Sequence, residues 1–286
     1  MKIAIVGLGV IGGSFAKAIR HHDNKHYIMA IDTNVETLKL AENQGFIDYG
    51  ETVNKTVLQQ ADLVIFALYP EVMKEYVRTH KNEFKDGAII TDTTGVKRTV
   101  IASMRDVIPS QVDFIFGHPM AGREKRGFEY ADASVFEGAN YVITPTDANN
   151  PRNIEWFKGF LANLGFKRVT ITDPDTHDEM IAHTSQLTHA IAVALINSDD
   201  RSHETIRFIG DSYRDLTRIA NMNEKLWPEL FMNNKDHLVT YMERFEEAFH
   251  ELKIAIQEDD VEKMEAIFKE STARRIKLQE SDLRIR

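Results

Sequence analysis

Residues 2–13 of this 286-residue chain read KIAIVGLGVIGG, and this stretch decides the fold. Its first five residues are apolar apart from one lysine, which is typical of a buried parallel strand. The glycines are spaced Gly7-x-Gly9-x-x-Gly12. In such a turn the first glycine permits a sharp bend, the second lets the backbone approach a pyrophosphate, and the third lets a helix pack close to the strand. The sequence therefore predicts a strand, a dinucleotide-binding turn and a helix that begins near Ile11.

An acidic residue twenty positions after the last of these glycines favours NAD as the dinucleotide. Asp32 follows a second apolar run, and its carboxylate could accept hydrogen bonds from the adenosine ribose and repel a 2′-phosphate. The same residue could instead be the N-cap of a helix predicted at 35–43. Contacts with NAD are predicted for the turn, for this aspartate and for one later loop: Gly7, Leu8, Gly9, Val10, Ile11, Gly12, Asp32 and Thr93.

Strands and helices alternate through the first 172 residues. Short runs rich in β-branched and apolar residues predict strands at 2–6, 26–31, 63–67, 88–91, 114–117, 141–144 and 168–172. Helical patterns separate several of them, at 35–43, 72–83, 96–107 and 153–164. This alternation predicts a mostly parallel sheet that is covered on both faces. We therefore expect residues 1–172 to form an α/β Rossmann NAD-binding domain.

The pattern changes after Asp173, where no convincing strand follows. Apolar residues recur every three or four positions over 177–197, 202–220, 236–256 and 261–278, which predicts long helices. Asp173 and Pro174 suit the N-cap and the first turn of the first helix. We expect residues 173–286 to form an all-α helical domain for substrate binding and dimerisation.

Composition and spacing exclude several classes of function. The formal net charge of −9 argues against a nucleic-acid partner. The chain has no cysteine, which rules out disulfides and thiolate metal sites and suits a reducing compartment. Its apolar opening stretch is short and interrupted by glycines, so we expect no membrane segment, no signal peptide and a cytoplasmic location. His177, His183 and His189 are six residues apart, so they cannot converge on one ion from one helix, and we expect no metal.

Polar residues at a strand end and on two helices are candidates for the chemistry. His118 follows a predicted strand, and an imidazole there could take a proton from a hydroxyl whose carbon loses hydride. A structural turn histidine is the alternative from the residues alone. Gln186 and His189 share one helix face, and Asp215 and Arg218 share another. An arginine held by an aspartate could clamp a carboxylate, although an ordinary surface ion pair has the same spacing.

Several motifs, in order and with matching spacing, resemble the prephenate dehydrogenase family. They are GLGVIGGSFA at 7–16, TDTTGVK at 91–97, GHPMAG at 117–122 followed by Glu124-Lys125-x-Gly127, and YRDLTRIA at 213–220. The resemblance covers nearly the whole chain. It implies an NAD-dependent oxidation of prephenate in which a hydride leaves ring C4, the ring carboxylate leaves as carbon dioxide, and 4-hydroxyphenylpyruvate forms on the route to tyrosine.

The resemblance also implies a role for each candidate residue. His118 would take the proton of the C4 hydroxyl, Arg218 would bind a substrate carboxylate, and His189 would lie near the pyruvyl side chain. Gln186 stands where relatives often carry histidine, which bears on the choice of substrate.

Three further residues acquire roles from the same resemblance. Asp215 would orient the site, Glu124 would belong to a gating ion pair, and Trp227 would close a pocket between the domains of a homodimer. The chain departs from the family at Gly95, where relatives usually carry a serine that binds the catalytic histidine and the substrate hydroxyl. Thr94, one residue earlier, is the candidate to supply that hydroxyl.

Three alternatives stay open from the sequence. The same chemistry on arogenate, which has an amino group in place of the side-chain keto group, is barely distinguishable. A β-hydroxyacid dehydrogenase shares the domain plan but generally uses a catalytic lysine, and none is found at a matching site near Gln186. A non-catalytic NAD-sensing protein would bind NAD without forming NADH.

Overall fold

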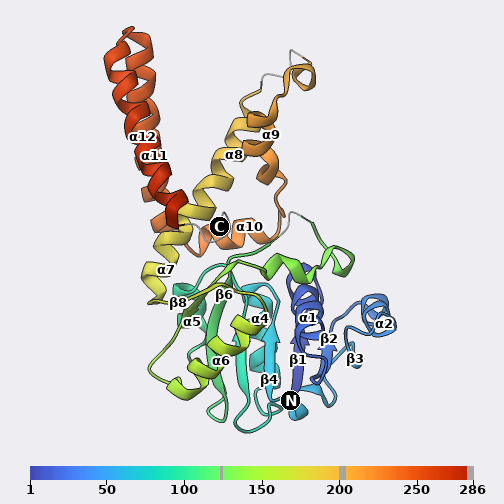
Figure 1. Cartoon of the computed structure of the whole chain (residues 1–286). Coiled ribbons are helices and arrows are strands. Elements are labelled where there is room, and N and C mark those ends of the chain that lie inside the picture. Colours follow the sequence, from blue (N-terminus) through green and yellow to red (C-terminus); the bar gives the residue numbers. More distant parts are fainter. Residues whose placement is uncertain (123–124, 200–203, 282–286) are drawn as a thin grey trace. The chain divides into compact units, whose positions relative to one another are not determined.

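The structure, a computed structural model, describes residues 1–122, 125–199 and 204–281. Its contacts divide the chain into two compact units, which Figure 1 colours along the sequence. The N-terminal unit comprises Met1–Asp178 together with Asn223–Leu226, and the C-terminal unit comprises the remainder. Residues 173–178, which follow the last strand, therefore pack with the N-terminal unit.

The N-terminal unit is built on one eight-stranded sheet with the order β3-β2-β1-β4-β5-β6-β7-β8. Its strands are β1 (Lys2–Val6), β2 (Tyr27–Ile31), β3 (Tyr49–Glu51), β4 (Leu63–Phe66), β5 (Ile89–Asp92), β6 (Asp113–Pro119), β7 (Asn140–Thr144) and β8 (Arg168–Ile171). All neighbouring strands run parallel except β6 and β7, which are antiparallel. The first six strands have the order of a Rossmann fold. Together with the helical C-terminal unit, this confirms the predicted fold class.

Helices connect these strands, and local signals account for their starts. They are α1 (Val10–His22), α2 (Val35–Asn43), α3 (Val57–Gln60), α4 (Pro70–His80), α5 (Arg98–Met104) and α6 (Pro151–Asn163), with 3-10 turns η1 (Phe128–Tyr130) and η2 (Ala133–Phe136). The side chain of Asn34 caps α2 by accepting hydrogen bonds from the backbone of Glu36 and Thr37. Asn150 caps α6 in the same way, and Pro151 follows it at the first helical position.

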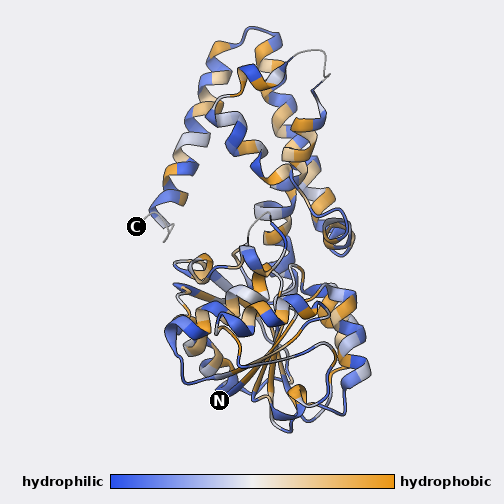
Figure 2. Ribbon diagram, turned by 90° about the vertical axis from the view of Figure 1, so that its right-hand side faces the viewer, coloured by the Kyte–Doolittle hydropathy of each residue, from blue (hydrophilic) through white to orange (hydrophobic). Residues whose placement is uncertain are grey.

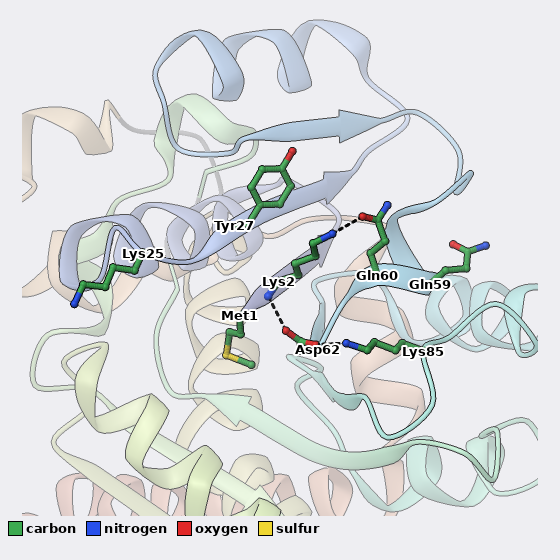
Figure 3. A pocket seen from close by; sticks show the side chains of 8 residues that line it. All are labelled: Met1, Lys2, Lys25, Tyr27, Gln59, Gln60, Asp62 and Lys85. Carbon is green, nitrogen blue, oxygen red and sulfur yellow. Dashed lines mark hydrogen bonds and ion pairs between the residues drawn. The ribbon is translucent and has the colours of Figure 1, made fainter.

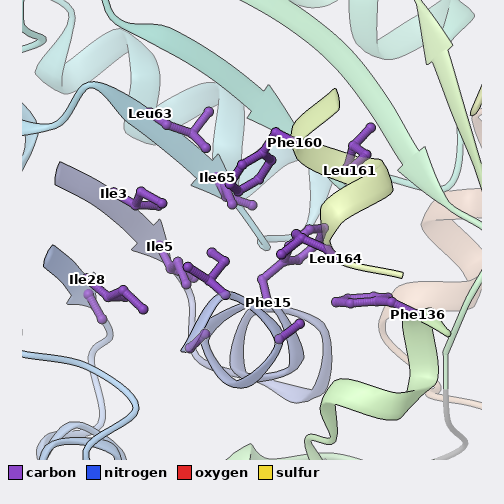
Figure 4. Packing of buried hydrophobic residues seen from close by; sticks show 14 of the residues in the cluster. Ile3, Ile5, Phe15, Ile28, Leu63, Ile65, Phe136, Phe160, Leu161 and Leu164 are labelled. Carbon is purple, nitrogen blue, oxygen red and sulfur yellow. The ribbon is translucent and has the colours of Figure 1, made fainter. Parts of the chain in front are cut away.

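The main core lies where apolar side chains of the strands meet α1 and α6. Ile3, Ile5 and Ile65 project from neighbouring strands toward Phe15 on α1, as Figure 4 shows. The ring of Phe15 lies 4.6 Å from that of Phe136. These side chains are almost completely buried, and each contributes about 1.5–3 kcal/mol to folding. The packing fixes α1 against β1 and so holds the glycine turn between them.

The C-terminal unit contains helices and no strand among its described residues. Its helices are α7 (Pro174–Ile181, which starts in the N-terminal unit), a π-helical turn η3 (Ala182–Gln186), α8 (Leu187–Asn197), α9 (Asp211–Thr217), α10 (Leu226–Met232), α11 (Lys235–Gln257) and α12 (Val261–Ser281). Two 3-10 turns, η4 (Thr205–Phe208) and η5 (Arg218–Ala220), flank α9. α11 and α12 pack side by side as a hairpin.

The structure corrects three predicted element bounds. The helix predicted at 202–220 is regular only over α9, because 3-10 turns interrupt it. The helix predicted at 177–197 contains the π-helical turn. β6 extends to Pro119, so His118 lies within the strand and not after it. β3, α3 and α10 were not predicted, because they are too short to show a periodicity.

We predict that Gly117→Ala destabilises the fold, because a Cβ there would overlap the Tyr141 hydroxyl and lie 2.7 Å from its Cε1. Tyr141 is fully buried and has no room to move, so the overpacking should lower the free energy of unfolding by about 1–3 kcal/mol. The matched control is Gly159→Ala in α6, where a Cβ would meet nothing within 4 Å, and it should raise stability by about 0.4–1 kcal/mol. Urea unfolding measures the free energy of unfolding of both variants. Equal changes in the two would contradict this account of Gly117.

Candidate active site

The glycine turn between β1 and α1 is shaped for a phosphate group. Gly7 has a φ of +93°, and a Cβ there would lie 2.6 Å from the carbonyl oxygen of Ala67. A Cβ at Gly12 would overlap the carbonyl oxygen of Gly7. The helix can therefore approach the turn this closely only because residue 12 is glycine. At Gly9, in contrast, a Cβ would meet nothing within 4 Å. The backbone is therefore open beside Gly9, at the amino end of α1, where a pyrophosphate fits.

Asp32 lies beside this turn and is not a helix cap. Its carboxylate accepts hydrogen bonds from the backbone N–H of Leu8 at 2.7 Å and of Asn34 at 2.8 Å. Asn34 caps α2, so the structure contradicts the alternative that Asp32 is the N-cap. A carboxylate has about four acceptor positions, so Asp32 can still accept a ribose hydroxyl. Asp32 directly follows β2, and its hydrogen bond with Leu8 N connects the carboxyl end of β2 to the turn that follows β1.

The other predicted cofactor residues lie along the same edge of the sheet. Val10 and Ile11 open α1, and Leu8 is buried within the turn. Thr93 follows β5, and its hydroxyl donates to the carbonyl oxygen of Phe66 at the end of β4, 3.2 Å away. The carboxyl ends of parallel strands are where ligands bind in open α/β sheets.

His118 is the next-to-last residue of β6 and is half-buried. Its Nδ1 lies 3.0 Å from Nε2 of His177. His177 is 2% exposed, and its Nδ1 lies 2.7 Å from a carboxylate oxygen of Asp178. Burial lowers the pKa of His118 well below its usual 6.5, and repulsion from His177 and Lys97 adds to this shift. His118 is therefore neutral at pH 7 and can accept a proton.

Asp178 is held in place by backbone N–H groups at the start of α5. One of its carboxylate oxygens accepts from Lys97 N at 2.7 Å and the other from Arg98 N at 2.8 Å. The local sequence explains how Asp178 reaches this position. Asp173 accepts from the backbone of residues 175 and 176, so it caps α7 as predicted, with Pro174 at the first helical position.

A buried ion pair lies beneath these groups. Lys97 and Asp92 are both completely buried, and the Lys97 ammonium is 2.6 Å from the Asp92 carboxylate. The ammonium also donates to the carbonyl and hydroxyl oxygens of Thr94, at 3.0 and 2.9 Å, so its three hydrogens are matched by three acceptors. Burial lowers the pKa of Lys97, and the charge of Asp92 opposes that shift. The other Asp92 oxygen accepts from Gly117 N at 3.0 Å, so the pair fixes the backbone immediately before His118.

The hydroxyl of Thr94 belongs to this buried cluster. It donates its one hydrogen to the Asp92 carboxylate and accepts from Lys97. The side chain is 4% exposed. Thr94 therefore supports the ion pair, and the geometry does not favour the predicted role of its hydroxyl as a substitute for the serine missing at Gly95.

In the C-terminal unit the structure brings two predicted residues together. The ring centroids of His189 and Trp227 are 3.9 Å apart. His189 Nδ1 lies 2.8 Å from the carbonyl oxygen of Ser185 in the π-helical turn, so it donates there. The single hydrogen of a neutral His189 ring is therefore on Nδ1.

Gln186 differs from its expected role as a substrate contact. Its side chain is 1% exposed. The amide donates to the carbonyl oxygen of Leu230 at 3.0 Å and accepts from Asn234 at 2.8 Å. Gln186 thus joins α10 to the start of α11, and its amide is occupied within the protein.

Of the remaining predicted residues, two are exposed and one is not described. Asp215 on α9 and Arg218 at the start of η5 are both exposed. Glu124 lies outside the described residues. Arg126 forms an ion pair with Glu224 at 2.6 Å, and both side chains are more than half exposed. This pair connects Arg126, eight residues after His118, to the segment that precedes Trp227.

The residues that support His118 were not predicted from the sequence. His177 was considered only as a metal ligand, and the buried roles of Asp178, Asp92 and Lys97 were not predicted. One signal was available: a His-Asp pair lies one turn into a helix that follows the last strand. Within the described residues, no group of three His, Asp or Glu side chains is placed to hold a metal ion. No described helix is both long and apolar enough to cross a membrane.

A shallow pocket lies at the opposite edge of the sheet, around the amino ends of β1 and β2 (Figure 3). Its polar side chains bond to one another: Lys2 donates to Gln60 at 2.6 Å, and Lys85 pairs with Asp62 at 2.5 Å. Because these groups satisfy each other, the pocket offers little to a ligand, and the candidate site is the carboxyl edge.

Two known domains match this chain. The nucleotide-binding domain of prephenate dehydrogenase matches residues 15–170, and the dimerization domain of prephenate dehydrogenase matches residues 173–270. A prephenate dehydrogenase from Lactococcus lactis subsp. cremoris is 31% identical over 94% of this chain and 75% of that protein. A cyclohexadienyl dehydrogenase from Zymomonas mobilis is 27% identical over 96% of this chain and 95% of that protein. The crystal structure of A. aeolicus prephenate dehydrogenase with hydroxyphenyl propionate and NAD+ has a TM-score of 0.88 at 29% identity, covering 97% of this chain and 98% of that one.

Removing one partner of the buried ion pair should be costly. Lys97→Met leaves the Asp92 charge uncompensated in the interior, and we expect the free energy of unfolding to fall by about 3–5 kcal/mol. The double variant Asp92→Asn, Lys97→Met should recover part of this loss, since it leaves no buried charge. Lys158→Met, which breaks an exposed pair with Glu155, is the control and should cost about 1 kcal/mol or less. Urea unfolding measures the free energy of unfolding of each variant. A double variant that is less stable than Lys97→Met would contradict this account of the buried pair.

Proposed function

The chain belongs to the prephenate dehydrogenase family, as its motifs predicted, and we propose that it oxidises prephenate with NAD to 4-hydroxyphenylpyruvate and carbon dioxide. One observation carries this proposal. His118, a neutral half-buried imidazole, lies at the carboxyl edge of the same sheet whose β1–α1 turn is open for a pyrophosphate. A dehydrogenation needs these two elements: a bound dinucleotide and a base for the hydroxyl proton.

The proposed roles of the residues follow from the chemistry. NAD bound at the glycine turn supplies the acceptor for the hydride that leaves ring C4. His118 takes the C4 hydroxyl proton, so that the oxygen can form a carbonyl. The bond to the ring carboxylate then breaks, its electron pair enters the ring, and the oxygen recovers the proton as the ring becomes aromatic. A general base of this kind contributes about 10²–10⁴ to the rate.

We further propose that the C-terminal unit recognises the substrate. Arg218 is exposed and could bind a carboxylate through two parallel hydrogen bonds. The neighbouring rings of His189 and Trp227 would contact the remainder of the substrate, with Asp215 orienting this group. A role for Glu124 in gating and the cytoplasmic location both stay predictions.

Arogenate is the alternative substrate. It shares the cyclohexadiene ring of prephenate, and the relative from Zymomonas mobilis is a cyclohexadienyl dehydrogenase. The reaction at C4 is the same for both compounds, so the His118 site does not distinguish them. The difference lies in the side chain, which carries a keto group in prephenate and an amino group in arogenate.

We also propose that the C-terminal unit forms a homodimer, in line with the matched dimerization domain. The sequence of α8, LTHAIAVALIN, is apolar around most of its surface, which is typical of a helix buried on all sides. In the single chain, however, Ile196 of α8 is 40% exposed. Phe249 on α11 and Phe268 on α12 are 61% and 53% exposed, and Figure 2 shows apolar residues along these helices. A second copy of the chain would cover such surfaces.

The decisive assay follows NADH absorbance with prephenate and with arogenate, using NAD and NADP in parallel. We expect NADH with NAD and prephenate. His118→Asn should lower kcat by about 10²–10⁴ without weakening NAD binding, because it removes the base and leaves the glycine turn intact. His22→Asn, at the exposed end of α1, is the control and should behave as wild type. A chain that binds NAD but forms no NADH with either substrate would be a non-catalytic sensor.

The dimer is tested by analytical ultracentrifugation. We expect the wild type to sediment at twice the mass of one chain. The double variant Phe249→Glu, Phe268→Glu should shift it toward the monomer, since charges would be buried without partners. The control Val53→Glu changes a residue of the N-terminal unit that is 59% exposed, and it should leave the sedimenting mass unchanged. A wild-type protein that stays monomeric at high concentration would refute the proposal.

A further inference from the structure

We infer that His177 and Asp178 are positioning residues that hold His118 in a single tautomer, with its hydrogen on Nδ1 and the lone pair on Nε2. In this arrangement Nε2 is the atom that takes the substrate proton. The inference rests on the proposed function only for the identity of that proton donor. The tautomer itself follows from the buried contacts of the N-terminal unit.

The assignment starts at Asp178, because a carboxylate can only accept hydrogen bonds. His177 Nδ1, 2.7 Å from Asp178, must therefore carry a hydrogen. A neutral imidazole carries only one, so Nε2 of His177 is a lone pair. His118 Nδ1 lies 3.0 Å from that lone pair and must donate to it. The single hydrogen of neutral His118 is thus on Nδ1, and Nε2 is free to act as a base.

Both imidazoles are neutral in this arrangement. Burial lowers the pKa of His118 well below 6.5, and the nearby Lys97 charge contributes to this shift. Burial also lowers the pKa of His177, although Asp178 and Asp92 oppose it. These are the charged groups that face the two rings: Asp92 from β5, Lys97 from the start of α5, and Asp178 from α7. At pH 7 each ring therefore carries one hydrogen.

The carboxylate of Asp178, where this chain of hydrogen bonds starts, is fixed in its orientation. Asp178 is completely buried, and its two oxygens accept from Lys97 N and Arg98 N. The Lys97 side chain is bonded to Asp92, which also accepts from Gly117 N. The same network therefore fixes the His118 ring through His177 and the His118 backbone through the preceding residue.

The arrangement also stabilises the charge that forms when His118 takes a proton. The imidazolium would still donate from Nδ1 to His177, and the negative charge of Asp178 lies one ring farther on. An aspartate that orients a catalytic histidine and stabilises its cation acts in this way in serine proteases. Here a second histidine is placed between the two.

Asp178→Asn tests the inference most directly. The Asp178 oxygen that faces His177 also accepts from Lys97 N, and the other accepts from Arg98 N, so the NH2 group of an asparagine meets a backbone N–H in either orientation. With the NH2 group toward His177, it donates to Nδ1, and the hydrogens of both His177 and His118 move to Nε2, which blocks the base. With the oxygen toward His177, the tautomer is kept but the negative charge that stabilises the His118 imidazolium is lost. We expect kcat to fall by about 10²–10⁴-fold with NAD affinity unchanged. His183→Asn, at an exposed histidine of η3, is the control and should retain full activity. An Asp178→Asn variant with wild-type kcat would overturn the inference.

A second pair of variants covers the case in which Asp178→Asn fails to fold. His177→Gln keeps a side-chain oxygen that can accept from His118, whereas His177→Leu removes the acceptor. We expect the glutamine variant to retain clearly more activity than the leucine variant. Equal losses in both would indicate that His177 only fills space, and would overturn the tautomer assignment.

The tautomer can be observed without any substrate. In 15N-histidine NMR of the whole chain, His118 should show a protonated Nδ1 and an unprotonated Nε2. Wild-type His118 with its hydrogen on Nε2 would refute the inference whether or not prephenate is oxidised. Conversely, if neither prephenate nor arogenate yields NADH, the proposed function is refuted. The NMR spectrum would still show on which nitrogen of His118 the hydrogen lies.

The pH profile of the wild type gives a last readout. A base works in its unprotonated form, above its pKa, and the pKa of His118 is lowered below 6.5. We therefore expect kcat/KM to stay constant as pH falls from 8 to 6.5 and to decline only below that value. A decline centred at or above pH 6.5 would contradict the buried, neutral imidazole pair.

Discussion

The completely buried ion pair between Lys97 and Asp92 is the interaction on which the N-terminal site depends. Placing two charges in the interior costs several kcal/mol each unless their remaining hydrogen-bonding capacity is used. This pair meets that condition, because Thr94 supplies two acceptors for the ammonium and Gly117 supplies a donor for the carboxylate. Satisfying the pair therefore fixes the path of the loop after β5 and the backbone of β6 immediately before His118.

Much of the fold could be predicted because its signals are local. The strand, glycine turn and helix at residues 2–22 each follow from nearest neighbours and from sterics at Gly7 and Gly12. The capping of α7 by Asp173 is likewise local. β3 escaped prediction because three residues show no periodicity, and its place at the sheet edge is fixed only by pairing with β2.

The detail of the site could not be predicted, because it depends on where side chains from distant segments point. Thr94 and Gln186 are polar residues beside motifs, and on sequence alone both could face a substrate. Both are instead buried and bonded within the protein. The Thr94 hydroxyl accepts from the Lys97 ammonium, and the Gln186 amide donates to a backbone carbonyl of α10. His177 and His118 are fifty-nine residues apart, and only the sheet and α7 bring them within 3.0 Å. The family resemblance predicted a role for His118 but carried no information on the residues that contact it.

The two units differ in how completely their described residues satisfy one another. In the N-terminal unit Lys97 and Asp92 form a buried ion pair, the imidazoles of His118 and His177 are linked to a carboxylate, and the apolar strands are covered. The C-terminal unit has the opposite balance, since α8, α11 and α12 expose large apolar side chains that water solvates poorly. A base that must keep one tautomer benefits from a rigid, self-contained scaffold, whereas exposed apolar helices gain stability only by association. The proposed proton-transfer group, His118, thus lies on the unit whose large apolar side chains are mostly buried within the chain.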